Sequence, residues 1–83
     1  MNPKPKIHVD FNSAIDELGR LPLSTVGAQE DIARLGLTLK EGMEIEVDDG
    51  DNLSADGIVR FSDSENIWVA EIDWKKLIYK DEE

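Results

Sequence analysis

The sequence predicts a mainly β domain with one short helix, arranged as a small antiparallel curved sheet or a partly open SH3-like β-barrel. Several short segments alternate apolar and polar residues with a period of two, which is typical of strands with one buried face. One segment has helical spacing instead. Most connections are too short for parallel crossovers, so neighbouring strands are expected to be antiparallel. Curvature or partial closure would limit the exposed strand edges.

The first half of the chain predicts two strands joined as a hairpin. Alternating apolar residues from Ile7 to Phe11 predict the first strand. The second strand is expected at residues 20–24, where Pro22 cannot donate a ladder hydrogen bond and therefore fits an edge or irregular strand. Together the two segments predict a hairpin over residues 7–24.

Residues 27–35 form the predicted helix. Gln29, Glu30 and Asp31 place acceptors and negative charge in its first turn, where the helix dipole favours them. Gly36 follows at the position where a left-handed residue ends a helix. Because so short a helix is marginal by itself, it is expected to pack against the sheet.

The second half of the chain predicts three more strands. The expected segments are a strand at 43–47, a loop rich in Gly, Asp and Asn at 48–57, a strand at 58–61, the longest strand at 67–74, and a last turn or short strand at 77–79. Trp68 is expected in the core and Trp74, near a strand end, half exposed. Ile67 and Val69 on the opposite face indicate a second packing surface, covered by the helix or by a partner subunit. Monomer and homodimer both stay open.

Length and composition fit one small domain. The 83 residues are divided into a flexible leader at 1–6, a single β-rich domain at 7–80 and an acidic tail at 81–83. The absence of cysteine excludes disulfides and thiolate chemistry, and a single histidine excludes a multi-histidine metal site within one chain. No apolar stretch approaches the roughly 18 residues of a membrane span, and the N-terminus lacks an apolar signal segment. A cytoplasmic protein with no membrane partner is expected.

The formal charge of −10 is unevenly distributed. Residues 1–40 carry five basic and five acidic side chains, whereas residues 41–83 carry four basic and fourteen acidic ones. Sequence-independent binding to nucleic acid depends on clustered Lys and Arg, so nucleic acid is not expected as a partner on this ground. The excess charge belongs to the second half alone.

Part of this charge falls on the outward positions of the predicted strands. If those strands lie side by side, the acids form one face that could dock a protein with a basic surface, although outward charge also serves solubility. Trp74 would add an apolar contact to this face. The residues assigned to the predicted interaction surface are Glu44, Glu46, Glu71, Asp73 and Trp74.

Two other features were weighed as sites, and neither is assigned. His8 and Asp10 could form a general-base pair, but the chain lacks a second histidine and a recognisable nucleophile motif. The loop at 48–57 offers oxygen ligands for calcium or magnesium, yet it lacks the EF-hand register; Asp, Asn and Gly there also suit turn geometry. No catalytic residue, metal ligand or cofactor is therefore predicted.

Two resemblances accompany this interpretation. Residues 57–62, Gly-Ile-Val-Arg-Phe-Ser, and residues 68–74, Trp-Val-Ala-Glu-Ile-Asp-Trp, resemble the C-terminal half of a group of small uncharacterised bacterial proteins. This resemblance implies a shared fold and no function. Residues 19–23, 35–37 and 42–47 resemble the strand–helix–strand pattern of AbrB-type swapped-hairpin regulators and antitoxins, which implies dimerisation and DNA binding.

The sequence therefore predicts a small, non-enzymatic, acidic interaction module that binds a protein partner. The first alternative is an AbrB-type transcriptional regulator or antitoxin. For this alternative, Arg20 and Arg34 are the basic residues in place, and the strands after Gly57 have no counterpart in a single hairpin. The second alternative is a weak divalent-cation-binding domain.

Overall fold

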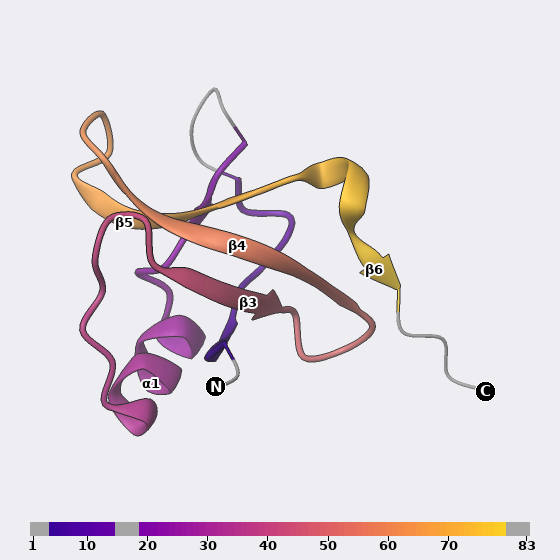
Figure 1. Cartoon of the computed structure of the whole chain (residues 1–83), viewed down its shortest axis with the longest axis horizontal. Coiled ribbons are helices and arrows are strands. Elements are labelled where there is room, and N and C mark those ends of the chain that lie inside the picture. The colour runs from indigo at the N-terminus through magenta and orange to yellow at the C-terminus, as the bar shows by residue number, and fades with distance from the viewer. Residues whose placement is uncertain (1–3, 15–18, 80–83) are drawn as a thin grey trace.

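The computed structural model describes residues 4–14 and 19–79 and contains six strands and one α-helix in that part (Figure 1). The predicted acidic tail at 81–83 lies outside the described residues. The elements in chain order are β1 (Lys6–His8), β2 (Leu21–Pro22), α1 (Val26–Leu35), β3 (Glu44–Asp48), β4 (Leu53–Ser62), β5 (Ile67–Ile72), the 3₁₀ turn η1 (Trp74–Lys76) and β6 (Ile78–Tyr79). The mainly β prediction with one short helix is confirmed.

The strands form one mixed sheet that curls into a half-barrel. Its order is β1-β3-β4-β5-β2, and β6 pairs with β4 beside this path. The neighbours are antiparallel except for β1 and β3, which are parallel. The predicted hairpin over residues 7–24 is wrong, because β1 pairs with β3 and β2 pairs with β5. The long connection from β1 to β3, which passes through β2 and α1, leaves room for the parallel crossover.

The start of the fold includes part of the predicted leader. β1 begins at Lys6, and the carbonyl of Pro5 accepts a hydrogen bond of 2.9 Å from the backbone N–H of Glu46. The Lys4 ammonium forms an ion pair of 3.2 Å with Asp56. Residues 4–6 are thus held against the sheet.

The central strand β4 is longer than expected. The predicted loop at 48–57 ends at residue 52, and β4 then pairs with β3 from Ser54 to Ile58. The start of this strand consists of small and polar residues, which the sequence pattern does not distinguish from a loop. Gly57 stands within it at a position where a side chain would crowd its neighbours. An added Cβ at Gly57 would lie 3.3 Å from Cγ2 of Ile72 and 3.6 Å from Cγ1 of Val47.

The core lies on the concave side of the sheet. Ile45 and Val47 are fully buried, whereas their neighbours in β3 point outward, as the alternation predicts. Trp68 packs against this core and makes an edge-on contact with Phe61 at 5.2 Å between ring centroids. Val69, which suggested a second packing surface, is fully buried within the chain itself. The other buried apolar residues are Ile7, Val9, Phe11, Leu21, Leu23, Ala28, Ala55, Val59 and Ala70.

The helix α1 has nearly the predicted bounds, but its first turn contains no acidic residue, so the predicted position of Glu30 and Asp31 in that turn is wrong. It begins one residue earlier than expected, because the side chain of Thr25 caps it by accepting a hydrogen bond from the N–H of Ala28. Gly36 ends it in the left-handed conformation, with φ of 65°. Ala28 is buried in the core, and Ile32 packs against it.

The helix also covers an open strand edge. The backbone N–H of His8, in the edge strand β1, donates a hydrogen bond of 2.8 Å to Oδ2 of Asp31 in α1. At the other end of the sheet, Pro22 of β2 has no N–H to offer. Both ends of the main strand path are thereby protected against pairing with other chains.

Asp31 is the residue whose loss tests this arrangement. Its Oδ1 accepts a hydrogen bond of 2.9 Å from Arg34, which lowers the pKa of the carboxyl, and the N–H of His8 lowers it further. Asp31→Ala is expected to reduce the free energy of unfolding by about 1 kcal/mol near neutral pH. Because the folded-state pKa lies below the ordinary value of 3.8, this difference is fully present above that value and is lost as pH falls through the lower pKa.

Urea unfolding of wild type and Asp31→Ala across the acidic range measures this difference. Asp31→Asn serves as the control, since its amide oxygen can still accept from His8 and a smaller loss is expected. A difference that stays constant down to about pH 2 would contradict the assignment.

Candidate functional site

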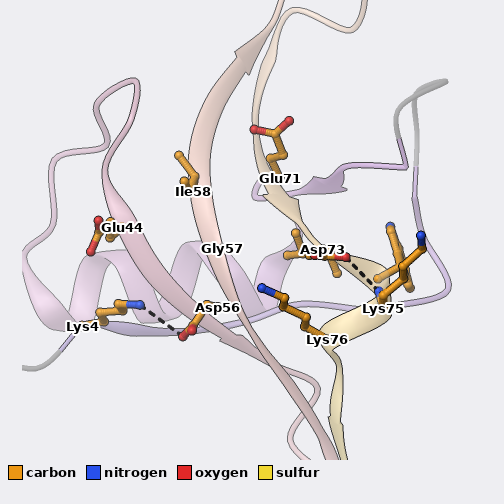
Figure 2. A pocket seen from close by; sticks show the side chains of 11 residues that line it. Lys4, Glu44, Asp56, Gly57, Ile58, Glu71, Asp73, Lys75 and Lys76 are labelled. Atoms are coloured by element: carbon orange, nitrogen blue, oxygen red, sulfur yellow. Dashed lines mark hydrogen bonds and ion pairs between the residues drawn. The ribbon is translucent and has the colours of Figure 1, made fainter.

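A groove of about 730 Å³ crosses the outer face of the sheet between β4 and η1 (Figure 2). Its floor is apolar and is surrounded by charged groups. Ile58 contributes from the outer face, in register with Glu44 and Glu71, and Ile72 contributes from the end of β5, where it packs against the core. The residues that line it are Lys4, Glu44, Asp56, Gly57, Ile58, Glu71, Ile72, Asp73, Trp74, Lys75 and Lys76.

The groove lies where the ladder along β4 is interrupted. Pairing with β5 ends at Gly57 and Ile72, and pairing with β6 begins at Ser54 and Ile78. Five residues, 73–77, therefore stand opposite two residues of β4, and the chain leaves β4 after β5 and returns to it at β6 (Figure 1). This interruption of the ladder by a long bulge opens the space that the groove occupies.

Local hydrogen bonds explain why the strand breaks here. The carboxylate of Asp73 accepts a hydrogen bond of 3.0 Å from the N–H of Lys75, which caps η1. The predicted strand over 67–74 therefore ends at Ile72, and Asp73 is a turn residue.

Trp74 forms a fixed wall of the groove. Its Nε1–H donates a hydrogen bond of 2.9 Å to the carbonyl of Gly19, and its ring meets Phe11 edge-on at 6.1 Å. Gly19 has φ of 71°, and an added Cβ there would lie 2.9 Å from Nε1 of Trp74. The side chain is 39% exposed, so the half-exposed position predicted for Trp74 is confirmed.

Four of the five residues of the predicted interaction surface line this groove: Glu44, Glu71, Asp73 and Trp74. Glu46 does not line it. It lies in the cross-strand row next to that of Glu44, where its partners in register are Lys6 on β1 and Asp56 on β4. Strand parity places Glu44 and Glu71 on the outer face, and the turn at η1 adds Asp73 and Trp74, so most of the predicted surface comes together.

Basic side chains break up the acidic face. Arg60 donates to Glu71 at 3.0 Å and lies 3.5 Å from Glu41, while Lys4 pairs with Asp56. The hydrogen bond that Arg60 donates to Glu71, supported by the charge of Glu41, raises the pKa of Arg60. The outer face is therefore a mixed-charge surface, whereas the predicted interaction surface contains no basic residue.

The sequence does carry a signal for two further cations that line the groove. Lys75 and Lys76 follow Trp74 directly, in a half of the chain with four basic residues in all. Basic residues next to an exposed aromatic one indicate a contact surface of their own. Lys4 and Ile58 carry no such signal, because their place in the groove depends on which strands pair.

His8 and Asp10 have separate structural roles: Asp10 accepts hydrogen bonds within its own turn, and His8 packs against two glycines. The carboxylate of Asp10 accepts hydrogen bonds of 2.9 Å from the N–H of Asn12 and 3.0 Å from the hydroxyl of Ser13. These bonds, the one from Asn12 first, lower the pKa of Asp10. The imidazole of His8 packs closely against Gly27 of α1 and Gly50 of the β3–β4 loop.

The β3–β4 loop uses its carboxylates to build turns. Oδ1 of Asp48 accepts from the N–H of Gly50 at 2.6 Å. Oδ1 of Asp49 accepts from the N–H groups of Asp51 and Leu53 at 2.8 and 3.1 Å. Within residues 4–14 and 19–79, no group of three or more histidine, aspartate or glutamate side chains is arranged to hold a metal ion. The turn role foreseen for these residues is confirmed.

Comparisons with protein-family models, curated proteins and solved structures give no significant match. The two resemblances drawn from the sequence therefore stay predictions. Among the residues that the structure describes, no helix has the length and apolar character needed to span a membrane.

The packing of His8 can be tested through Gly27. An added Cβ at Gly27 would lie 2.6 Å from Cδ2 and 3.2 Å from Cγ of His8. Gly27→Ala is therefore expected to destabilise the fold by about 1–3 kcal/mol, despite the better helix propensity of alanine. In a His8→Ala background the obstruction is gone, and the same substitution should be neutral or stabilising by up to about 1 kcal/mol. Urea unfolding of the four proteins of this cycle measures the coupling. Equal effects in both backgrounds would exclude the contact.

The turn role of the loop carboxylates can be tested with a matched pair. Asp49→Ala removes an acceptor of two backbone hydrogen bonds and is expected to cost about 1 kcal/mol. Asp51→Ala is the control, because its carboxylate accepts no hydrogen bond from the described residues, and its effect should stay within about 0.5 kcal/mol. Thermal unfolding of both variants measures the difference. Similar losses would contradict the assignment, and localised, saturable amide shifts on adding calcium would support the cation-binding hypothesis instead.

Proposed function

We propose that the protein is a non-enzymatic interaction module that binds a protein partner through the groove. One observation supports the proposal: Glu44, Glu71 and Asp73, assigned to an interaction surface from strand parity, and Trp74, assigned as an aromatic residue near a strand end, line the same apolar-floored groove. Glu44 of β3 meets residues 71–74 of the segment from β5 to η1 there, although the two parts are far apart in the sequence.

The groove offers the two kinds of contact that protein interfaces combine. Ile58, Ile72 and the exposed part of Trp74 can bury an apolar side chain of the partner, which would supply most of the affinity. The charged groups around them fix orientation and exclude wrong partners. The hydrogen bond from Trp74 to Gly19 holds this wall in place before binding, so little conformational entropy is lost there.

The charge of the whole chain acts at longer range. A net charge of −10 attracts a basic partner and speeds its diffusional encounter. Glu46, outside the groove, belongs to this long-range field. The two alternatives, an AbrB-type regulator and a cation-binding domain, do not depend on the groove, and a groove variant separates them from the proposal.

The test compares two charge reversals with the same net effect. Glu44→Lys changes a groove residue whose side chain makes no ion pair with the described residues, and Asp63→Lys changes an exposed residue of the β4–β5 turn. Glu44→Lys is expected to reduce capture of the partner by immobilised protein about tenfold, because an attraction becomes a repulsion. Asp63→Lys should leave capture within about twofold.

Quantitative mass spectrometry of proteins captured from lysate at about 0.15 M salt measures the difference. Circular dichroism verifies that both variants fold. Equal losses would mean that net charge alone attracts the partner, and no loss with either variant would mean that the groove is unused. Each of these outcomes contradicts the proposal.

A further inference from the structure

We infer that the groove takes a linear segment of its partner in which an apolar residue stands between a basic and an acidic residue. This inference rests on the proposed function and specifies the partner that the groove would select. It derives from the different charges on the two sides of the groove.

The two sides carry opposite free charges. Glu44 projects from β3 on one side, and Lys75 and Lys76 belong to η1 on the other (Figure 2). None of these three side chains makes an ion pair or hydrogen bond with the described residues. Their charges are therefore available to a ligand.

The remaining charges of the groove already have partners. Asp56 pairs with Lys4 at 3.2 Å, and Glu71 accepts from Arg60 at 3.0 Å. Asp73 accepts from the N–H of Lys75. A ligand that bound these carboxylates would first have to displace existing contacts, so Glu44 is the carboxylate best placed to select a cation.

The apolar floor separates the two charged sides. Ile58 lies on the outer face in register with Glu44 and Glu71. Ile72, in register with Gly57 at the end of β5, packs against the core and lines the groove where the ladder is interrupted. Trp74 bounds it on the side of η1. β3 and β5 flank β4, so two strand spacings of about 4.8 Å each separate the strand of Glu44 from the strand that leads into η1. An extended segment advances about 3.3 Å per residue and needs at least about three residues to cross this width.

Charge also decides between this occupant and others. A second copy of the chain would bring a second charge of −10 to the interface, and like charges oppose that association. A nucleic acid strand would place phosphates beside Glu44, Glu71 and Asp73. A mixed-charge peptide satisfies both sides at once.

The test is peptide selection on the folded protein. A display library of random linear peptides is selected against wild type, Glu44→Lys, the double variant Lys75→Glu/Lys76→Glu, and the control Asp63→Lys. Wild type and the control are expected to enrich peptides with an apolar residue flanked by a base on one side and an acid on the other. Selection against Glu44→Lys should enrich peptides that carry an acid in place of the base. Selection against the lysine double variant should enrich peptides that carry a base in place of the acid.

Affinity and position are then measured with the selected peptides. Fluorescence anisotropy is expected to show about tenfold weaker binding of the wild-type peptide to Glu44→Lys, with recovery for the peptide whose base is exchanged for an acid. Amide NMR shifts should fall on Ile58, Ile72 and the Trp74 indole N–H.

The outcomes separate the two claims. Peptides that map to the groove but carry no opposite-sign pair, or whose flanking charges do not change in the variants, overturn the inference and leave the proposed function standing. Failure to enrich any peptide that shifts the groove resonances, together with equal protein capture by Glu44→Lys and Asp63→Lys, overturns both.

Discussion

Backbone pairing along β4 is the constraint on which the rest of the structure depends. This strand pairs with β3 on one edge and with β5 and then β6 on the other, so it joins the two halves of the sheet. Because β5 and β6 are separate pieces of one chain segment, the second edge of β4 contains a gap. The cap at Asp73 fixes where that gap begins, and Trp74, tied to Gly19, fixes its far wall. The same pairing thus holds the fold and creates the groove.

The edges of the sheet show how a small domain protects its strand edges while leaving the groove open. α1 covers β1 through Asp31, and Pro22 withholds a donor at the other end. The glycines against His8 allow the helix and the β3–β4 loop to approach its ring from two sides. Packing of this kind matters in a chain of 83 residues, because its core is small and each close contact is a large part of its stability.

Alternation and capping were readable from the sequence, and pairing partners were not. β3, β5 and α1 were expected near their observed positions because period-two alternation and Gly36 are local signals. The start of β4 was missed because Ser54, Asp56 and Gly57 are typical loop residues, and their strand conformation depends on tertiary pairing. The parallel pairing of β1 with β3 has no local signature. Strand parity is a local signal, and it correctly predicts that Glu44 and Glu71 share one face. That Lys4 and Ile58 line the groove depends on which strands pair, and the local sequence does not show this.

In the proposed function, the acidic charge and the groove contribute to recognition at different distances. At physiological salt the Debye length is about 8 Å, so the −10 charge affects approach and orientation before contact. Once a ligand lies in the groove, the apolar floor and the nearby charges of Glu44, Lys75 and Lys76 determine how long it stays. Most carboxylates around the floor already have partners, so the excess charge of the chain adds little to selectivity there. In the proposed interaction, selectivity comes from Glu44, Lys75 and Lys76, which have no ion-pair partner among the described residues and carry both signs of charge.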